Sequence, residues 1–166
     1  GLNQLDTAVK HYEQALEIKP DYTEAFNNLG SVLNELGKPD TAVKSYEKIL
    51  SIKPDFAEAH YNLAVSLQEL NQLDDAVKHY EQAIKIKPDY AEAHNNLGIT
   101  LKELDQLDDA VKSYEKAVAI KPDYAEAHNN LGIALKELGQ LDAAINCCKQ
   151  ALTIKPDFSE AHNNLG

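Results

Sequence analysis

The chain has 166 residues, with 27 acidic residues, 16 lysines and no arginine, and its formal net charge is −11. This charge disfavours nucleic acid as a partner, because phosphate neutralisation drives that binding, and it equally disfavours an anionic membrane surface. No apolar run approaches the roughly 18 residues of a membrane helix, and the first residues lack the pattern of a signal peptide.

A phrase of twelve residues, Lys87–Gly98, returns almost unchanged at Lys121–Gly132. Looser copies begin at Lys19, Lys53 and Lys155, so that the Lys-Pro pairs recur every 34 residues. A fixed period in this range predicts an array of small repeats, each of which buries its core only by stacking on its neighbours.

The repeat boundaries follow from taking Thr23 as the first position. The complete repeats are then 23–56, 57–90, 91–124 and 125–158. Residues 1–22 match the second half of an earlier repeat, and residues 159–166 match the start of a later one. We therefore expect a single array over 1–166, cut from a longer protein because the chain contains no methionine.

Each repeat is predicted to hold two helices. In the third repeat, the first helix is expected to begin at Asp89, with Asp89 and Glu92 forming a capping box. It should stop at Asp105, a residue type that tolerates a left-handed backbone. The second helix should run from Asp108 to Ile120. The positions equivalent to Asp105 are Asn3, Gly37, Asn71 and Gly139.

Small residues recur on both helices. Each glycine in mid-helix costs about 1 kcal/mol of helix propensity, so we expect a close approach between helices in return. The glycines are Gly30, Gly98, Gly132 and Gly166, and the matching alanines of the second helix are Ala8, Ala42, Ala76, Ala110 and Ala144.

The chain resembles the tetratricopeptide repeat family over its whole length. The residues that carry the resemblance are His94, Leu97-Gly98, Leu101, Ala110, Tyr114 and Pro122, at the family's spacing. The resemblance implies an all-α fold, a right-handed superhelical solenoid of antiparallel helix pairs, with a concave groove that receives an extended peptide. The chain departs from the family where tryptophan is usual (Phe26 or a histidine) and where Cys148 replaces a tyrosine.

One column of asparagines recurs on the first helices, although asparagine is a mediocre helix former. A carboxamide carries both donors and an acceptor, and it can therefore pair with both groups of a peptide unit. We predict that this column contacts a bound peptide, the alternative being that it bonds to its own scaffold. The first asparagine column is Asn28, Asn62, Asn96, Asn130 and Asn164.

A second, weaker column lies beside the first. Its members are Asn27, Tyr61, Asn95, Asn129 and Asn163, and Lys102 and Lys136 complete the predicted peptide-binding face. The columns are similar to the asparagine ladder in the repeat domain of O-linked N-acetylglucosamine transferases and SPINDLY-like proteins. Because no transferase domain is present in these residues, we expect no catalytic residue, no enzyme activity and no cofactor in this chain.

Two acidic columns admit two interpretations. They either complement the dipoles and amides of helix N-termini or steer basic or polar segments of a partner into the groove. The columns are Asp21, Asp55, Asp89, Asp123 and Asp157, and Glu24, Glu58, Glu92, Glu126 and Glu160.

The histidines and cysteines are predicted to have structural roles. Equivalent histidines of neighbouring repeats should lie at least ~8–10 Å apart, too far to share a metal ion, so we expect packing and no metal site. The histidines in one column are His60, His94, His128 and His162. Adjacent cysteines rarely form a relaxed disulfide, so Cys147 and Cys148 are expected to be free thiols in a reducing, cytoplasmic compartment.

Three functions follow as alternatives. The first is a protein-interaction module that binds a peptide in the asparagine-lined groove. The second is a scaffold that associates head to tail through uncapped ends, where Leu2, Leu5 and Leu165 would lack partners. The third is the substrate-docking part of a transferase similar to those that carry the asparagine ladder.

Overall fold

The computed structural model describes residues 2–165, with side chains for residues 4–164. Gly1, Gly166 and the side chains of Leu2, Asn3 and Leu165 lie outside the described residues. The described residues form helices and turns only. They fall into an N-terminal part that ends at Pro88 and a C-terminal part that begins at Asp89.

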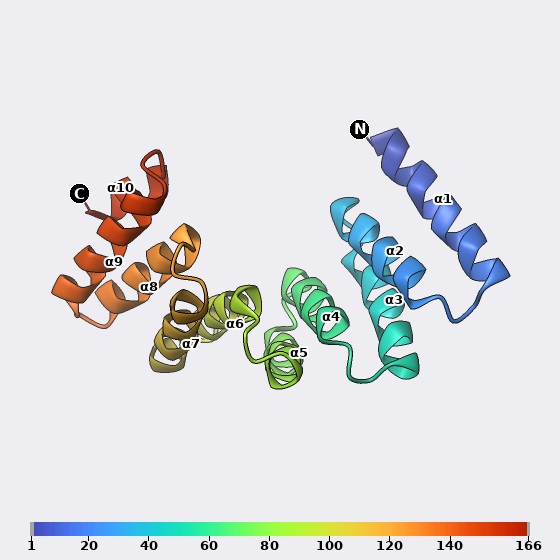
Figure 1. Cartoon of the computed structure of the whole chain (residues 1–166), viewed down its shortest axis with the longest axis horizontal. Coiled ribbons are helices and arrows are strands. Elements are labelled where there is room, and N and C mark those ends of the chain that lie inside the picture. Colours follow the sequence, from blue (N-terminus) through green and yellow to red (C-terminus); the bar gives the residue numbers. More distant parts are fainter. Residues whose placement is uncertain (1, 166) are drawn as a thin grey trace. The chain divides into compact units, whose positions relative to one another are not determined.

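The N-terminal part packs its helices in consecutive pairs (Figure 1). Helix α2 packs on α3 and α4 packs on α5, while α1 lies against α2 and α3 lies against α4. The bounds are α1 (Leu2–Ile18), α2 (Thr23–Glu35), α3 (Pro39–Ile52), α4 (Ala57–Glu69) and α5 (Leu73–Ile86).

The C-terminal part repeats this arrangement. Helix α6 packs on α7 and α8 packs on α9, while α7 lies against α8 and α10 contacts both α8 and α9. The bounds are α6 (Ala91–Glu103), α7 (Leu107–Ile120), α8 (Ala125–Glu137), α9 (Leu141–Ile154) and α10 (Ser159–Leu165). The predicted all-α fold of helix pairs is confirmed, and the predicted second helix of the third repeat differs from α7 by one residue.

The predicted capping box is wrong. Helix α6 begins at Ala91 with Tyr90 at the N-cap, and no side chain caps it. Asp89 lies before the N-cap, in the turn that follows Pro88, so its carboxylate is not placed to accept from the first amides of the helix. Glu92 does lie in the first turn, where a negative charge complements the helix dipole.

The turn before each first helix explains the recurring Lys-Pro-Asp-aromatic sequence. In the turn that ends α7, the Lys121 ammonium lies 4.8 Å from the centroid of the Tyr124 ring. The backbone N–H of Tyr124 also donates to the Lys121 carbonyl at 3.1 Å. The same cation–π contact joins Lys53 to Phe56 at 4.7 Å. The repeated phrase is thus a built turn in which the lysine covers the aromatic ring.

The predicted left-handed stops between the paired helices are confirmed. The backbone φ angles are +67° at Gly37, +57° at Asn71, +59° at Asp105 and +76° at Gly139. These residue types adopt this conformation at the least steric cost. Asn3, which the repeat spacing aligns with them, lies inside α1 instead.

Two of the mid-helix glycines, Gly30 and Gly98, make room for a tyrosine ring of the paired helix. A Cβ atom on Gly98 would lie 2.6 Å from the Tyr114 ring, and one on Gly30 would lie 2.6 Å from the Tyr46 ring. Tyr46 and Tyr114 are each 1% exposed. The close approach expected from the glycines is therefore between a helix backbone and a tyrosine ring.

Candidate functional site

The first asparagine column forms hydrogen bonds from repeat to repeat within each part of the chain. Nδ2 of Asn62 donates to Oδ1 of Asn27 at 3.0 Å in the N-terminal part. In the C-terminal part, Asn130 donates to Asn95 at 3.1 Å and Asn164 donates to Asn129 at 2.9 Å. We call these three bonds the carboxamide ladder. Each joins a first-column donor to a second-column acceptor 35 residues earlier.

The second asparagine column supplies the buried acceptors of this ladder. Asn95 is 4% exposed and Asn129 is 1% exposed. Side chains this deeply buried present little surface to a ligand, and their direct contact with a peptide stays a prediction. They position the carboxamides of Asn130 and Asn164, which are half-buried.

Three other predicted residues differ from this pattern. Asn28 is exposed, and none of the hydrogen bonds between described side chains involves it. Oδ1 of Asn96 accepts from Nδ2 of Asn95 at 3.2 Å. The Tyr61 ring lies 5.9 Å from the Tyr80 ring, centroid to centroid, where the other repeats have an amide.

Each asparagine that donates in the ladder is held through its Nδ2, while its own side-chain oxygen stays available to a ligand. Among the described residues, the side-chain oxygens of Asn62, Asn130 and Asn164 accept no hydrogen bond. Because the Nδ2 bond fixes the rotation of each carboxamide, each oxygen has a set direction. The adjacency of two asparagines in most repeats was the sequence signal for this arrangement, but adjacency alone does not show which asparagine donates.

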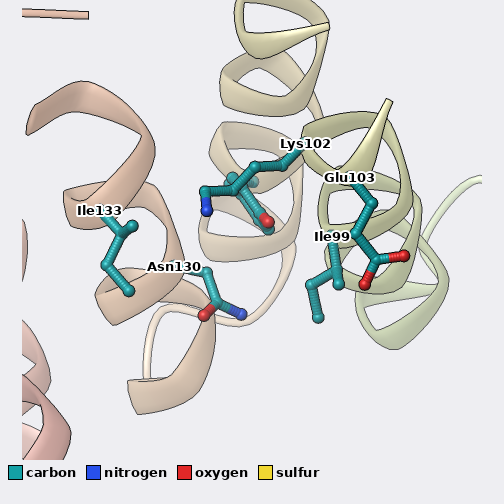
Figure 2. A pocket seen from close by; sticks show the side chains of 6 residues that line it. Ile99, Lys102, Glu103, Asn130 and Ile133 are labelled. Carbon is teal, nitrogen blue, oxygen red and sulfur yellow. The ribbon is translucent and has the colours of Figure 1, made fainter. Parts of the chain in front are cut away.

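Asn130 lines a cavity of about 260 Å³ between α6, α7 and α8. Figure 2 shows Ile99 and Ile133 on opposite sides of the cavity, with the Lys102 ammonium and the Asn130 carboxamide between them. Lys102 bonds to Glu137 at 3.0 Å, an ion pair whose side chains are 33% and 43% exposed. Burial, and then the carboxylates of Glu103 and Glu137, raises the pKa of Tyr114, whose side chain also lines the cavity. The site therefore combines apolar walls, a directed carboxamide and nearby acidic groups.

The acidic column on the first helices makes ion pairs along the array. Lys121 bonds to Glu92 at 3.1 Å, and Lys155 lies 3.5 Å from Glu126. Both pairs are about half exposed and contribute little to stability. The two glutamates are thus partly neutralised by lysines of the following turn.

Three of the column histidines contact the turn before their own helix, and one of them has a second, unpredicted partner. Nε2 of His60, His128 and His162 lies 2.9–3.0 Å from the carbonyl oxygen of the proline six residues earlier. Nδ1 of His60 also lies 3.0 Å from Nδ1 of His79 on α5. Sequence reasoning compared histidines between repeats and missed this pair, which lies 19 residues apart within one repeat.

The contact between His60 and the Pro54 carbonyl decides which ring nitrogens of His60 and His79 carry protons. Because a carbonyl oxygen only accepts, Nε2 of His60 carries the proton, and in the neutral ring Nδ1 is then an acceptor. His79 therefore donates from its own Nδ1. Burial, and then the nearby His60 ring, lowers the pKa of His79, while Asp75 and Lys78 act on it in opposite directions.

The described residues contain no group of three side chains that would hold a metal ion, and none of the described helices is long and apolar enough to cross a membrane. Cys147 and Cys148 are both free. Burial raises the pKa of each thiol, and the Cys148 charge raises that of Cys147 further. This is the environment of an unreactive structural thiol.

Similar solved structures cover nearly the whole chain. The crystal structure of MamA is 28% identical, has a TM-score of 0.86 and covers 93% of this chain and 90% of its own. YrrB, a TPR protein described as having an unusual peptide-binding site, is 24% identical and has a TM-score of 0.80. The match covers 97% of this chain and 83% of YrrB. TTC0263, a TPR protein of Thermus thermophilus, is 23% identical and has a TM-score of 0.78. The match covers 99% of this chain and 90% of TTC0263. Curated proteins gave no match.

Family models match the repeats one after another. A model described as TPR repeat matches residues 2–37, 30–70, 66–105 and 100–139, and one described as tetratricopeptide repeat matches residues 125–158. These matches follow the 34-residue period and the helix pairs of the structure. With matches from residue 2 to residue 158, the chain belongs to the tetratricopeptide repeat family.

Proposed function

We propose that this chain is a protein-interaction module that binds an extended segment of a partner protein along the carboxamide faces of its first helices. Membership in a family of repeat modules supports this function class. The observation that carries the proposal is Asn130. Its Nδ2 is held by Asn95, while its Oδ1 is directed by that bond and its side chain lines a cavity with Ile99 and Ile133.

The carboxamide suits a peptide backbone because a peptide N–H donates to Oδ1 and a peptide carbonyl accepts from the second N–H of Nδ2. Asn62 supplies the same combination in the N-terminal part. A row of such groups recognises the peptide main chain with little regard to its sequence, while the isoleucines favour an apolar side chain between them. Asn96 and Lys136 belong to the same proposed face.

The partner segment is proposed to be basic or polar. The chain carries a net charge of −11, and two carboxylates lie near the Tyr114 hydroxyl of the cavity. Such a field speeds the association of a positively charged segment and weakens as salt rises.

The test is a peptide-display selection on the immobilised chain, repeated with the variant Asn62→Ala/Asn96→Ala/Asn130→Ala. Each lost pairing of about 1 kcal/mol should weaken a selected peptide about fivefold. Asn146→Ala on α9 is the matched control, because Asn146 is exposed and lines neither cavity. Urea unfolding of all three proteins verifies that they are folded at the assay temperature. Unchanged affinity in the triple variant would overturn the proposal.

Two alternatives make different predictions. Head-to-tail association predicts an apparent mass that rises with concentration and that Leu5→Lys abolishes, although Leu165, the other residue of that prediction, has its side chain outside the described residues. A transferase-docking role predicts a catalytic domain elsewhere in the intact protein. The similar structures found, MamA, YrrB and TTC0263, give this transferase role no support.

A further inference from the structure

The fourth complete repeat lacks the buried tyrosine that the other three complete repeats have on their second helix. Tyr46, Tyr80 and Tyr114 occupy equivalent positions and are at most 1% exposed. In the repeats of Tyr46 and Tyr114, the ring lies against the mid-helix glycine so closely that a Cβ on that glycine would be 2.6 Å away. The fourth repeat keeps the glycine, Gly132, but has Cys148 in place of tyrosine.

A cavity of about 190 Å³ lies beside Cys148 in this repeat. A thiol fills less space than a phenol, although the thiol also lies against the glycine, since a Cβ on Gly132 would be 2.9 Å from Sγ of Cys148. The lining residues are Gly132, Lys136, Leu141, Ala144, Ile145, Cys148 and Asn164. In the preceding repeat, Tyr114 itself lines the cavity, and the matching Gly98 and Ala110 do not.

This cavity lies on the proposed peptide-binding face, one repeat beyond the cavity of Asn130. The two cavities share three equivalent lining positions, which are Lys102 and Lys136, Tyr114 and Cys148, and Asn130 and Asn164. They differ in that the second cavity also reaches Gly132 and Ala144 beside Cys148, and its outer wall includes Leu141 and Ile145, which are 57% and 42% exposed. A side chain of a peptide bound along this face therefore has a recess available at the second position.

The chemistry of the recess matches an aromatic ring. Its floor consists of Gly132, Ala144 and Cys148, which offer apolar contact. Lys136 also lines this cavity and supplies a cation to it. A cation over an aromatic face is a favourable pairing, and this chain already uses it in its turns, as between Lys155 and Phe158 at 5.0 Å.

We propose that the cavity at Gly132 and Cys148 takes an aromatic side chain of the bound partner segment, next to the position that a tyrosine of the chain occupies in the other repeats. This inference rests on the proposed function, because the ring is supplied by a peptide on the same face. The site makes the fourth repeat selective, whereas the carboxamides recognise any main chain.

The first test uses p-cresol, the side-chain analogue of tyrosine, as the probe. Titrated into the ¹⁵N-labelled full chain, p-cresol should shift the amide resonances of Gly132 and Ala144. Cys148→Tyr should abolish these shifts by filling the cavity, and Cys148→Ala should retain them. n-Butanol, an aliphatic probe, should bind at least several-fold more weakly. Absence of shifts with p-cresol, persistence of the shifts in Cys148→Tyr, or equal binding of n-butanol would each overturn the proposal.

Thermal unfolding separates cavity filling from misfolding. Cys148→Tyr restores the packing of the other repeats, so its Tm should equal or exceed that of the parent, and Cys148→Phe serves as a second filling variant if the tyrosine fails to fold. Peptide display on the parent and on Cys148→Tyr completes the test. Aromatic residues should be enriched at one position on the parent only. Enrichment without aromatic preference overturns this inference and leaves the proposed function standing. No enrichment on either protein, even with p-cresol bound, overturns the proposed function and with it the role of the cavity in peptide binding.

Discussion

Asn164 donates a 2.9 Å hydrogen bond from Nδ2 to Oδ1 of Asn129, a side chain that is only 1% exposed. This bond joins α10 to α8 and repeats the relationship of Asn130 to Asn95 one repeat earlier. The same side chains are therefore scaffold and candidate site, because the scaffold bond uses one N–H and leaves the oxygen to a ligand. The scaffold role of these asparagines is therefore compatible with the proposed peptide contact.

The ladder predicts a difference between two asparagines that look alike in the sequence. Asn129→Ala removes a buried acceptor and leaves its donor unpaired, so the free energy of unfolding should fall by about 1–3 kcal/mol. Asn28→Ala, the control, removes a side chain outside the ladder and should raise helix stability by a few tenths of a kcal/mol. Urea unfolding followed by circular dichroism measures both. Equal effects of the two substitutions would contradict the ladder.

Gly98→Ala should destabilise the chain although alanine is the better helix former. The added Cβ would lie 2.6 Å from the Tyr114 ring, and overpacking of this kind costs about 1–3 kcal/mol, which offsets a propensity gain of about 1 kcal/mol. In a Tyr114→Ala background the ring is gone and the same change should be neutral or stabilising. A double-mutant cycle in urea isolates this coupling; additivity of the two changes would show that the ring is not the cause.

The pair of His60 and His79 predicts loss of stability on acidification. The pKa of His79 is lower in the folded chain than in the unfolded chain, so between these two values the unfolded chain binds more protons. Stability from this group is therefore complete above the unfolded value of about 6.5 and declines as the pH falls below it. Urea midpoints measured from about pH 8 to pH 5, the range in which histidine titrates, should decline more steeply in the parent than in His79→Ser.

Serine is the matched replacement in that experiment because Ser45 and Ser113 hold the equivalent position in neighbouring repeats. The remaining histidines contribute equally to both proteins, so the difference between the two curves belongs to the pair. Curves that run parallel over the whole range would exclude a role for His79.

The two thiols should react slowly with iodoacetamide near neutral pH. Burial raises the pKa of both Cys147 and Cys148, which lowers the fraction of thiolate, the form that reacts. The rate should rise with pH and should still fall short of the rate of the chain unfolded in urea at each pH. Mass spectrometry of labelled peptides measures the rate, and a native rate equal to the unfolded one at neutral pH would contradict the assigned environment.

The sequence by itself determined the helices, their pairing and the repeat. The 34-residue period can be read directly from the sequence, and residues that tolerate a left-handed stop, such as Asp105, end a helix through their own backbone preference. The capping box failed because Tyr90, one residue nearer the helix than Asp89, takes the N-cap. Whether Asp89 or Tyr90 takes that position depends on the turn after Pro88, which the residue types alone do not specify.

The tertiary structure alone decided which asparagines donate, which are buried and where a cavity opens. Asn95 and Asn96 are neighbours of the same residue type, and only the packing of α6 against α8 turns Asn95 into an acceptor for Asn130. The replacement of tyrosine by Cys148 is visible in the sequence, but its consequence is not. That consequence depends on the position of Gly132 opposite the missing ring, since a cavity is a property of atoms that face each other across the fold.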